Sequence, residues 1–337
     1  MSKRFLAAAC AAATALALSA CSSAPSSEGN ASKDGTLTVM ASFYPLQYLV
    51  EKIGGEHVTV TSLTPAGAEP HDLELSPKTV DALASADAVV YLAGFQAAVD
   101  EAIEQQAPTT VIDVSPAAEL VEANSSANHP SEDEDADEAQ SGESATEEHA
   151  DHDHEGHDHE GHHHDMSTDP HFWLDPVRMA SAATLVGDKL AEADPANADT
   201  YKANAKTLNE ELSALGDDLV AKTATCQIKT FVTAHTAFGY LADRTGLTQV
   251  GISGLDPDSS PSPARLAEIG QIAKNQGVTT IFTEALIDPK VAQTLADDLG
   301  ISTAVLDPIE SQTDSSKDYT AVMKDNINAL ATANNCQ

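Results

Sequence analysis

Histidine and acidic side chains gather in one internal stretch of the 337-residue chain. Nine of the 13 histidines lie between His129 and His164, interleaved with Asp and Glu. Neutral imidazole suits zinc, copper, nickel and cobalt, and the interleaved carboxylates attract cations. The tract therefore predicts a metal-handling protein; a solvated acidic linker with incidental histidines is the alternative. The loop histidines expected to bind metal are His149, His152, His154, His157, His159, His162, His163 and His164.

The same stretch carries much of the chain's negative charge. The formal net charge is -36, and 15 acidic residues lie between Glu132 and Asp165. A run so acidic and so poor in aromatic residues cannot bury enough apolar surface to offset its chain entropy. We therefore expect a disordered loop over residues 123–167. The excess of acid argues against nucleic acid as a partner and favours the collection of cations.

The N-terminus has the pattern of a secretory signal. Lys3 and Arg4 precede a short apolar run, which ends in Leu18-Ser19-Ala20-Cys21. This ending resembles the bacterial lipobox and implies cleavage of a signal peptide (1–20) and lipidation of Cys21, with residues 21–36 as a flexible tether. An ordinary signal with a chance cysteine is the alternative. No other stretch is long and apolar enough to be a transmembrane helix.

Two cysteines remain once the signal and the lipid-bearing residue are set aside. Cys226 and Cys336 form an even pair in an oxidising compartment, so we predict a disulfide between them. Two free thiols, or a thiolate metal ligand, are the alternatives, although neither cysteine has the spacing of a CxxC metal site.

Short β-branched runs alternate with helical patterns on both sides of the acidic tract. Strands are expected at 37–42, 57–63, 88–94 and 109–114, and again at 227–234, 248–253, 278–285 and 301–307. Near-continuous apolar strands are typical of parallel sheets buried on both faces. We predict an α/β fold of two βαβ-type lobes joined by a long rigid helix. The expected divisions are an N-terminal lobe at 37–175, connecting helices at 176–225 and a C-terminal lobe at 226–337.

Four residues able to bind metal follow expected strands. His71 and His171 come from the first half, and His235 and Asp307 come from the second. In open α/β sheets, ligands bind beyond the carboxyl ends of the strands. Each residue alone has an ordinary structural explanation, but their joint placement predicts one zinc-like site of three imidazoles and a carboxylate between the lobes.

The motifs around these residues resemble a known family. The segments PHDLELSP, DPHFWLDP, FVTAHTAFGYLADRTGL, IFTEALIDP and AVLDP resemble the metal-binding receptors of bacterial ABC transporters, specifically the zinc-uptake (ZnuA-like) branch. The resemblance implies a Zn²⁺ site at the lobe interface with His71, His171, His235 and Asp307 as ligands. It also implies delivery to a membrane permease powered by an ATPase. The manganese branch typically has Glu at the third position, so His235 favours zinc.

Two further acids are candidates for auxiliary roles at the site. Metal-bound imidazoles usually donate their second N–H to a carboxylate or a carbonyl. Glu284, at a strand end in IFTEA, is the expected acceptor, and Glu69, two residues before His71, could instead approach the metal.

These features predict a lipid-anchored, monomeric zinc receptor outside the cytoplasm, on the cell membrane. A manganese or other divalent-metal receptor and a metal-sequestering surface lipoprotein are the alternatives. A zinc metallohydrolase is a further alternative, but the sequence has no HExxH and no GxSxG motif, and a fourth protein ligand would close the site that catalysis needs open. We therefore expect that the chain is not an enzyme.

Overall fold

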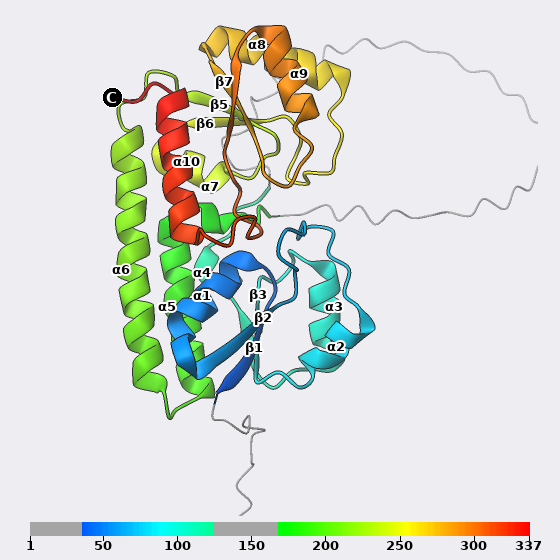
Figure 1. Cartoon of the computed structure of the whole chain (residues 1–337), viewed down its shortest axis with the longest axis vertical. Coiled ribbons are helices and arrows are strands. Elements are labelled where there is room, and N and C mark those ends of the chain that lie inside the picture. Colours follow the sequence, from blue (N-terminus) through cyan, green and yellow to red (C-terminus); the bar gives the residue numbers. More distant parts are fainter. Residues whose placement is uncertain (1–35, 124–167) are drawn as a thin grey trace, which may run out of the picture.

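The computed structural model describes residues 36–123 and 168–337 (Figure 1). The expected signal peptide, the lipidation site Cys21 and the tether up to residue 35 lie outside these ranges, as do residues 124–167 of the His-rich loop with the eight histidines expected to bind metal. Within the described ranges, none of the helices combines the length and hydropathy needed to cross a membrane.

Two four-stranded sheets form the centres of two lobes. Both sheets are entirely parallel, with strand orders β2-β1-β3-β4 and β6-β5-β7-β8. The N-terminal strands are β1 (Leu37–Ala41), β2 (Val58–Ser62), β3 (Ala88–Tyr91) and β4 (Val111–Asp113). The C-terminal strands are β5 (Thr230–Thr233), β6 (Thr248–Gly251), β7 (Thr280–Thr283) and β8 (Ser302–Val305). The predicted α/β fold class is therefore confirmed, with strands shorter than the sequence suggested.

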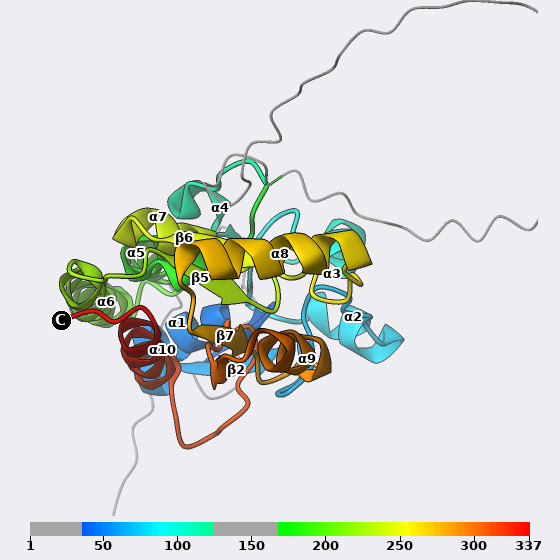
Figure 2. The ribbon, with the colours of Figure 1, turned by 90° about the horizontal axis from the view of Figure 1, so that it is seen from above.

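Helices cover both faces of each sheet, which is why the central strand β3 is apolar on both sides, whereas β2 alternates and β8 is largely exposed. Val89 of β3 packs toward α2 and α3, whereas the next residue, Val90, packs toward α1 and the connecting helices. In the C-terminal lobe, α8 and α9 share one core and lie side by side in the view from above (Figure 2). The helices of the lobes are α1 (Tyr44–Gly54), α2 (Pro77–Leu83), α3 (Ala97–Gln106), α4 (Ser115–Ala118), α7 (Gly239–Thr245), α8 (Pro263–Gln276), α9 (Lys290–Leu299) and α10 (Tyr319–Ala333).

Two long helices connect the lobes along one side of the molecule (Figure 1). α5 (Pro176–Ala193) and α6 (Ala198–Thr223) pack against each other, and α6 also contacts α1 of the first lobe and α10 of the second. The helices approach closely at Gly187, where a Cβ atom would lie 2.3 Å from the Cβ of Ala205. The long connecting helix predicted from the sequence is present, although it begins at Ala198, so Pro195 precedes its first turn.

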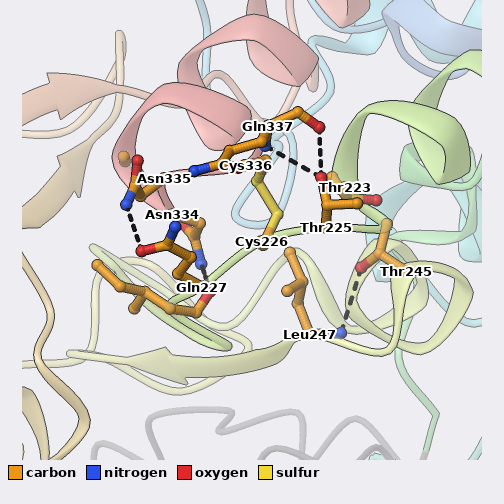
Figure 3. The surroundings of a disulfide bond; sticks show 12 residues. Thr223, Thr225, Cys226, Gln227, Thr245, Leu247, Asn334, Asn335, Cys336 and Gln337 are labelled. Atoms are coloured by element: carbon orange, nitrogen blue, oxygen red, sulfur yellow. Dashed lines mark hydrogen bonds between the residues drawn. A yellow bond between two sulfur atoms is a disulfide. The ribbon is translucent and has the colours of Figure 1, made fainter.

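A disulfide attaches the C-terminus to the end of the connector, as Figure 3 shows. Cys226, shortly after α6, pairs with Cys336, and the bond closes a loop of sequence separation 110. The predicted pairing is thus present in the structure. In the chain-entropy account, closing a loop of this length stabilises the fold by about 4–5 kcal/mol.

Candidate metal site

Four side chains from both lobes converge at the interface between them. His71, His171, His235 and Glu310 each direct one ligand atom to a common point, and these atoms all lie within 4.8 Å of one another. Oε1 of Glu310 lies 3.2 Å from Nε2 of both His171 and His235, and 3.5 Å from Nε2 of His71. These distances leave the three imidazole nitrogens and the carboxylate oxygen grouped closely enough to share one ion.

Three of the four ligand atoms are held in segments that follow a strand, whereas His171 comes after α4 and the segment 124–167 in the sequence. His71 lies between β2 and α2, and His235 comes two residues after β5. His171 precedes the short helix η2 (Phe172–Leu174), and Glu310 follows β8. The carboxyl ends of the two sheets therefore face each other across the site, which is the placement expected for ligands of open α/β sheets.

Burial and close contact together set the charges in the site. Burial lowers the pKa of His71. Burial also opposes charge on His171 and His235, but contacts with carboxylates outweigh it, raising the pKa of His171 and placing that of His235 well above 6.5. Although burial disfavours its charge, the three imidazoles hold the pKa of Glu310 well below 4.5. The site is therefore a buried carboxylate surrounded by imidazole rings whose nitrogen atoms can bind either a proton or a metal ion.

Two of the three imidazoles are fixed by carboxylates behind them. Nδ1 of His235 lies 2.7 Å from Oε2 of Glu284, whose other oxygen accepts the backbone N–H of His235 at 3.0 Å. Nδ1 of His171 lies 2.8 Å from Oδ1 of Asp169. When Nδ1 donates to a carboxylate, the lone pair of Nε2 is free to bind a cation. Glu284 thus lies where the sequence analysis expected an acceptor, whereas Asp169 was missed, although its place two residues before His171 was a usable signal.

His71 is held differently from the other two rings. Its Nδ1 has no hydrogen-bond partner among the described residues. Its backbone N–H donates to Oε2 of Glu69 at 2.8 Å, and the other oxygen of Glu69 lies 4.0 Å from Nε2 of His71. Burial raises the pKa of Glu69 to about 7 despite this backbone bond. Glu69 therefore stabilises the turn that carries His71, but it is not one of the four residues whose ligand atoms converge.

The structure corrects the carboxylate predicted for the site. Asp307, the expected ligand, is absent from the group of four, and Glu310 takes its place. Oδ1 of Asp307 accepts the N–H of Ile309 at 2.8 Å, so this side chain closes a turn. Ile309 adopts a positive φ of 57°, and the chain then presents Glu310 to the histidines. The prediction of Asp307 as the ligand was therefore wrong by three residues, because the turn after β8 presents Glu310 to the histidines instead.

Aromatic rings line one side of the site. The ring of Trp173 lies 5.2 Å from that of His171, and the ring of Phe95 meets that of His71 edge-on at 4.9 Å. Nε1 of Trp173 donates to the carbonyl of Pro308 at 2.7 Å, which fixes the turn before Glu310. Three imidazoles and one carboxylate in a buried site form a donor set typical of tetrahedral zinc.

Comparisons with known proteins agree with this geometry. Residues 39–333 match the family model described as "ZnuA: Zinc-uptake complex component A periplasmic". The chain is 34% identical over 323 residues to the high-affinity zinc uptake system protein ZnuA of Bacillus subtilis (strain 168), covering 94% of this chain and 93% of that protein. It is 33% identical over 301 residues to the zinc-binding protein AdcA of Streptococcus pyogenes, covering 88% of this chain but only 56% of that longer relative.

A solved structure with a bound metal is also similar. The Zn(II)-bound ZnuA-like domain of Streptococcus pneumoniae AdcA superposes with a TM-score of 0.68 at 28% identity, covering 89% of this chain and 99% of that one. Two α/β lobes joined by a long helix are therefore shared with solved structures of this type, and this one is described as Zn(II)-bound.

Proposed function

The chain belongs to the ZnuA family of zinc-uptake components, and on this premise we propose that it is a receptor that binds Zn²⁺ outside the cytoplasm and delivers it to the permease of an ABC transporter. The ligands are Nε2 of His71, His171 and His235 and a carboxylate oxygen of Glu310. The observation that carries the proposal is the convergence of these four atoms from both lobes. Zinc is the cargo of this receptor, which is not an enzyme.

The choice of zinc over other divalent metals rests on the donor set. Three neutral imidazoles and one carboxylate suit zinc, whereas manganese favours carboxylate, carbonyl and water oxygens. The carboxylates of Glu284 and Asp169 hold two of these imidazoles in the tautomer that binds metal. A manganese receptor would benefit from an oxygen donor in place of His235.

The proposed setting on the cell follows from the sequence alone. Residues 1–20 are proposed as a signal peptide and Cys21 as a lipid anchor, which together place the monomeric receptor at the outer face of the cell membrane beside the permease. The histidines at 149–164 are proposed to capture zinc ahead of the interlobe site or to sense its level.

Calorimetric titration with zinc tests this function directly. We compare protein that begins after Cys21 with the same protein lacking residues 129–164. One tight site should survive the deletion and be competed poorly by manganese, while the total zinc stoichiometry falls. Loss of all tight binding with the deletion would mean that the interlobe group does not bind zinc tightly and that the protein only sequesters metal.

Uptake separates a receptor from a sequestering surface lipoprotein that uses the same site. Cells that lack the gene should take up zinc slowly at low external zinc, and the wild-type chain should restore uptake. A His235→Ala variant should fail to restore it. Restoration by that variant would contradict the assignment of the interlobe site to transport.

A further inference from the structure

Tyr240 connects the C-terminal lobe to the segment that carries His171. It lies on α7, five residues after His235, and its side chain is buried. Its hydroxyl donates to the backbone carbonyl of Asp169 at 2.7 Å and accepts the backbone N–H of Val121 at 3.0 Å. A buried tyrosine hydroxyl usually finds one partner, but this one joins two chain segments of the opposite lobe.

The residue held by Tyr240 is the one that orients His171. Oδ1 of Asp169 accepts the backbone N–H of His171 at 2.9 Å and lies 2.8 Å from its Nδ1. The backbone N–H of Asp169 donates to the carbonyl of Val121 at 3.0 Å. The peptide groups around Asp169 are thus fixed on both sides, by Val121 and by the Tyr240 hydroxyl. Because the carboxylate moves with this backbone, its alignment with His171 depends on Tyr240.

The ring of Tyr240 is itself held in place by the opposite lobe. The guanidinium of Arg178, on α5, lies 4.8 Å from the ring centroid and donates to the backbone carbonyl of Ala118. Arg244, one turn further along α7, forms a two-point ion pair with Asp175, the residue that caps α5. Two positions on α7 therefore dock it against the first lobe, which keeps the Tyr240 hydroxyl in register with Asp169.

We infer that Tyr240 is a positioning residue for the interlobe metal site, acting through Asp169 to hold the His171 ring in its metal-binding orientation. The inference rests on the proposed zinc-binding function. It links two ligands across the interface, because His235 lies four residues before the start of α7 and His171 lies two residues after Asp169. Loss of the hydroxyl leaves every ligand atom present but frees the backbone that aligns one of them.

Tyr240→Phe tests the inference, with Tyr201→Phe as its matched control. The Tyr201 hydroxyl is also bonded to a carboxylate, that of Asp194 at 2.9 Å, but Tyr201 lies near the start of α6. The turn that joins α5 to α6 is at the end of these helices away from the C-terminal lobe (Figure 1). Trp173, the only tryptophan of the chain, lies beside His171 and reports this site by its fluorescence without a signal from the His-rich loop. Zinc affinity and release are followed on purified protein by competition with a chelator.

The expected result is a loss of affinity at one site only. Removing a group that contacts a metal-bound histidine typically costs about 10- to 100-fold in metal affinity. Tyr240 contacts Asp169 and not the histidine itself, so we expect a loss of zinc affinity of about 3- to 10-fold, mostly through faster zinc release. Tyr201→Phe should bind zinc as the wild type does. An unchanged affinity and release rate in Tyr240→Phe would overturn the inference.

A double-mutant cycle distinguishes positioning from a general structural effect. In an Asp169→Ala background, Tyr240→Phe should cause no further loss of affinity, because no carboxylate remains to be aligned. In a Glu284→Gln background the loss should be retained in full. Equal losses in both backgrounds, accompanied by an equal fall in the melting temperature of the metal-free protein, would assign Tyr240 to stability alone. Absence of tight zinc binding in the wild type would refute the proposed function itself, before any variant is compared.

Discussion

His235 of the C-terminal lobe and His71 of the N-terminal lobe are held in different ways. His235 follows a strand, and a buried carboxylate, Glu284, holds both its ring and its backbone. His71 lies in the irregular segment between β2 and α2, and its Nδ1 lacks a partner among the described residues. The ring of His235 is therefore oriented before metal arrives, whereas His71 depends on the conformation of its loop. His171 is held by Asp169 in the same way as His235, so these two histidines form the rigid part of the site and the His71 loop completes it.

The largest expected difference is between His235→Ala and His71→Ala in the metal-free protein. Removing His235 leaves Glu284 and Glu310 without their shared cationic partner in a buried site, which should cost about 3–5 kcal/mol of unfolding free energy. Removing His71 should cost about 1 kcal/mol or less. Urea denaturation at pH 6 measures both values. Similar destabilisation by the two substitutions would remove the proposed asymmetry, even if both abolish tight zinc binding.

Substitution of Glu284 and of Glu69, the acids that contact His235 and His71, should give a smaller difference, in this case in zinc affinity. Glu284→Gln weakens the acceptor for Nδ1 of His235 and should reduce zinc affinity by about 10- to 100-fold. Glu69→Gln keeps an oxygen for the backbone N–H of His71 and touches no Nδ1, so its effect should be below about tenfold. Chelator competition measures both. A larger loss in Glu69→Gln would indicate that Glu69 itself binds the metal.

Opposite pH dependences should follow from the opposite pKa shifts of the two histidines. The pKa of His235 is raised above 6.5, so its contribution to stability is complete below pH 6.5 and is lost as pH rises through the folded-state value. The pKa of His71 is lowered, so its burial destabilises the fold as pH falls below 6.5. The stability deficit of metal-free His235→Ala should therefore shrink as pH rises above 6.5. The stability deficit of metal-free His71→Ala should shrink as pH falls below 6.5. Denaturation across this pH range measures both deficits. Deficits that change in the same direction with pH in the two variants would contradict the assignment.

The smallest expected effect concerns the contact between the His71 loop and the second lobe. The backbone N–H of Gly67 donates to Oγ of Ser311 at 2.7 Å, beside Glu310. Ser311→Ala removes this bond, worth about 0.5–1.5 kcal/mol, and should speed zinc release by about 2- to 10-fold. Stopped-flow release measures the rate, with Ser316→Ala as a control because Ser316 bonds only within its own exposed turn. Equal rates in the two variants would mean that the loop is held by other contacts.

Much of the fold and of the site could be predicted from local sequence patterns. The alternation of apolar strands with helical patterns was sufficient for two parallel sheets and the connecting helix, since burial on both faces leaves a continuous apolar run. His71, His171 and His235 were predicted from their places after strands, and the structure brings them together. Short elements such as α7 and η2 were not predicted, because seven residues or fewer carry too little periodicity.

The carboxylates were harder to predict because their roles depend on backbone turns. Asp307 and Glu310 both follow β8, and only the turn stabilised by Trp173 and closed by Asp307 itself determines which of them faces the histidines. Asp169 lies two residues before His171, but its bond to Nδ1 depends on a backbone that Tyr240 holds from the other lobe.

The sequence by itself indicated the kind of metal chemistry and the α/β architecture, because residue type and periodicity express these locally. The cysteine count predicted the pairing of Cys226 with Cys336, which the structure contains. Only the tertiary structure decided that Glu310 completes the group, that Nδ1 of His71 has no hydrogen-bond partner among the described residues and that Tyr240 connects the lobes. These features depend on contacts between segments far apart in the chain, such as the 3.5 Å between Nε2 of His71 and Oε1 of Glu310, which no local pattern encodes.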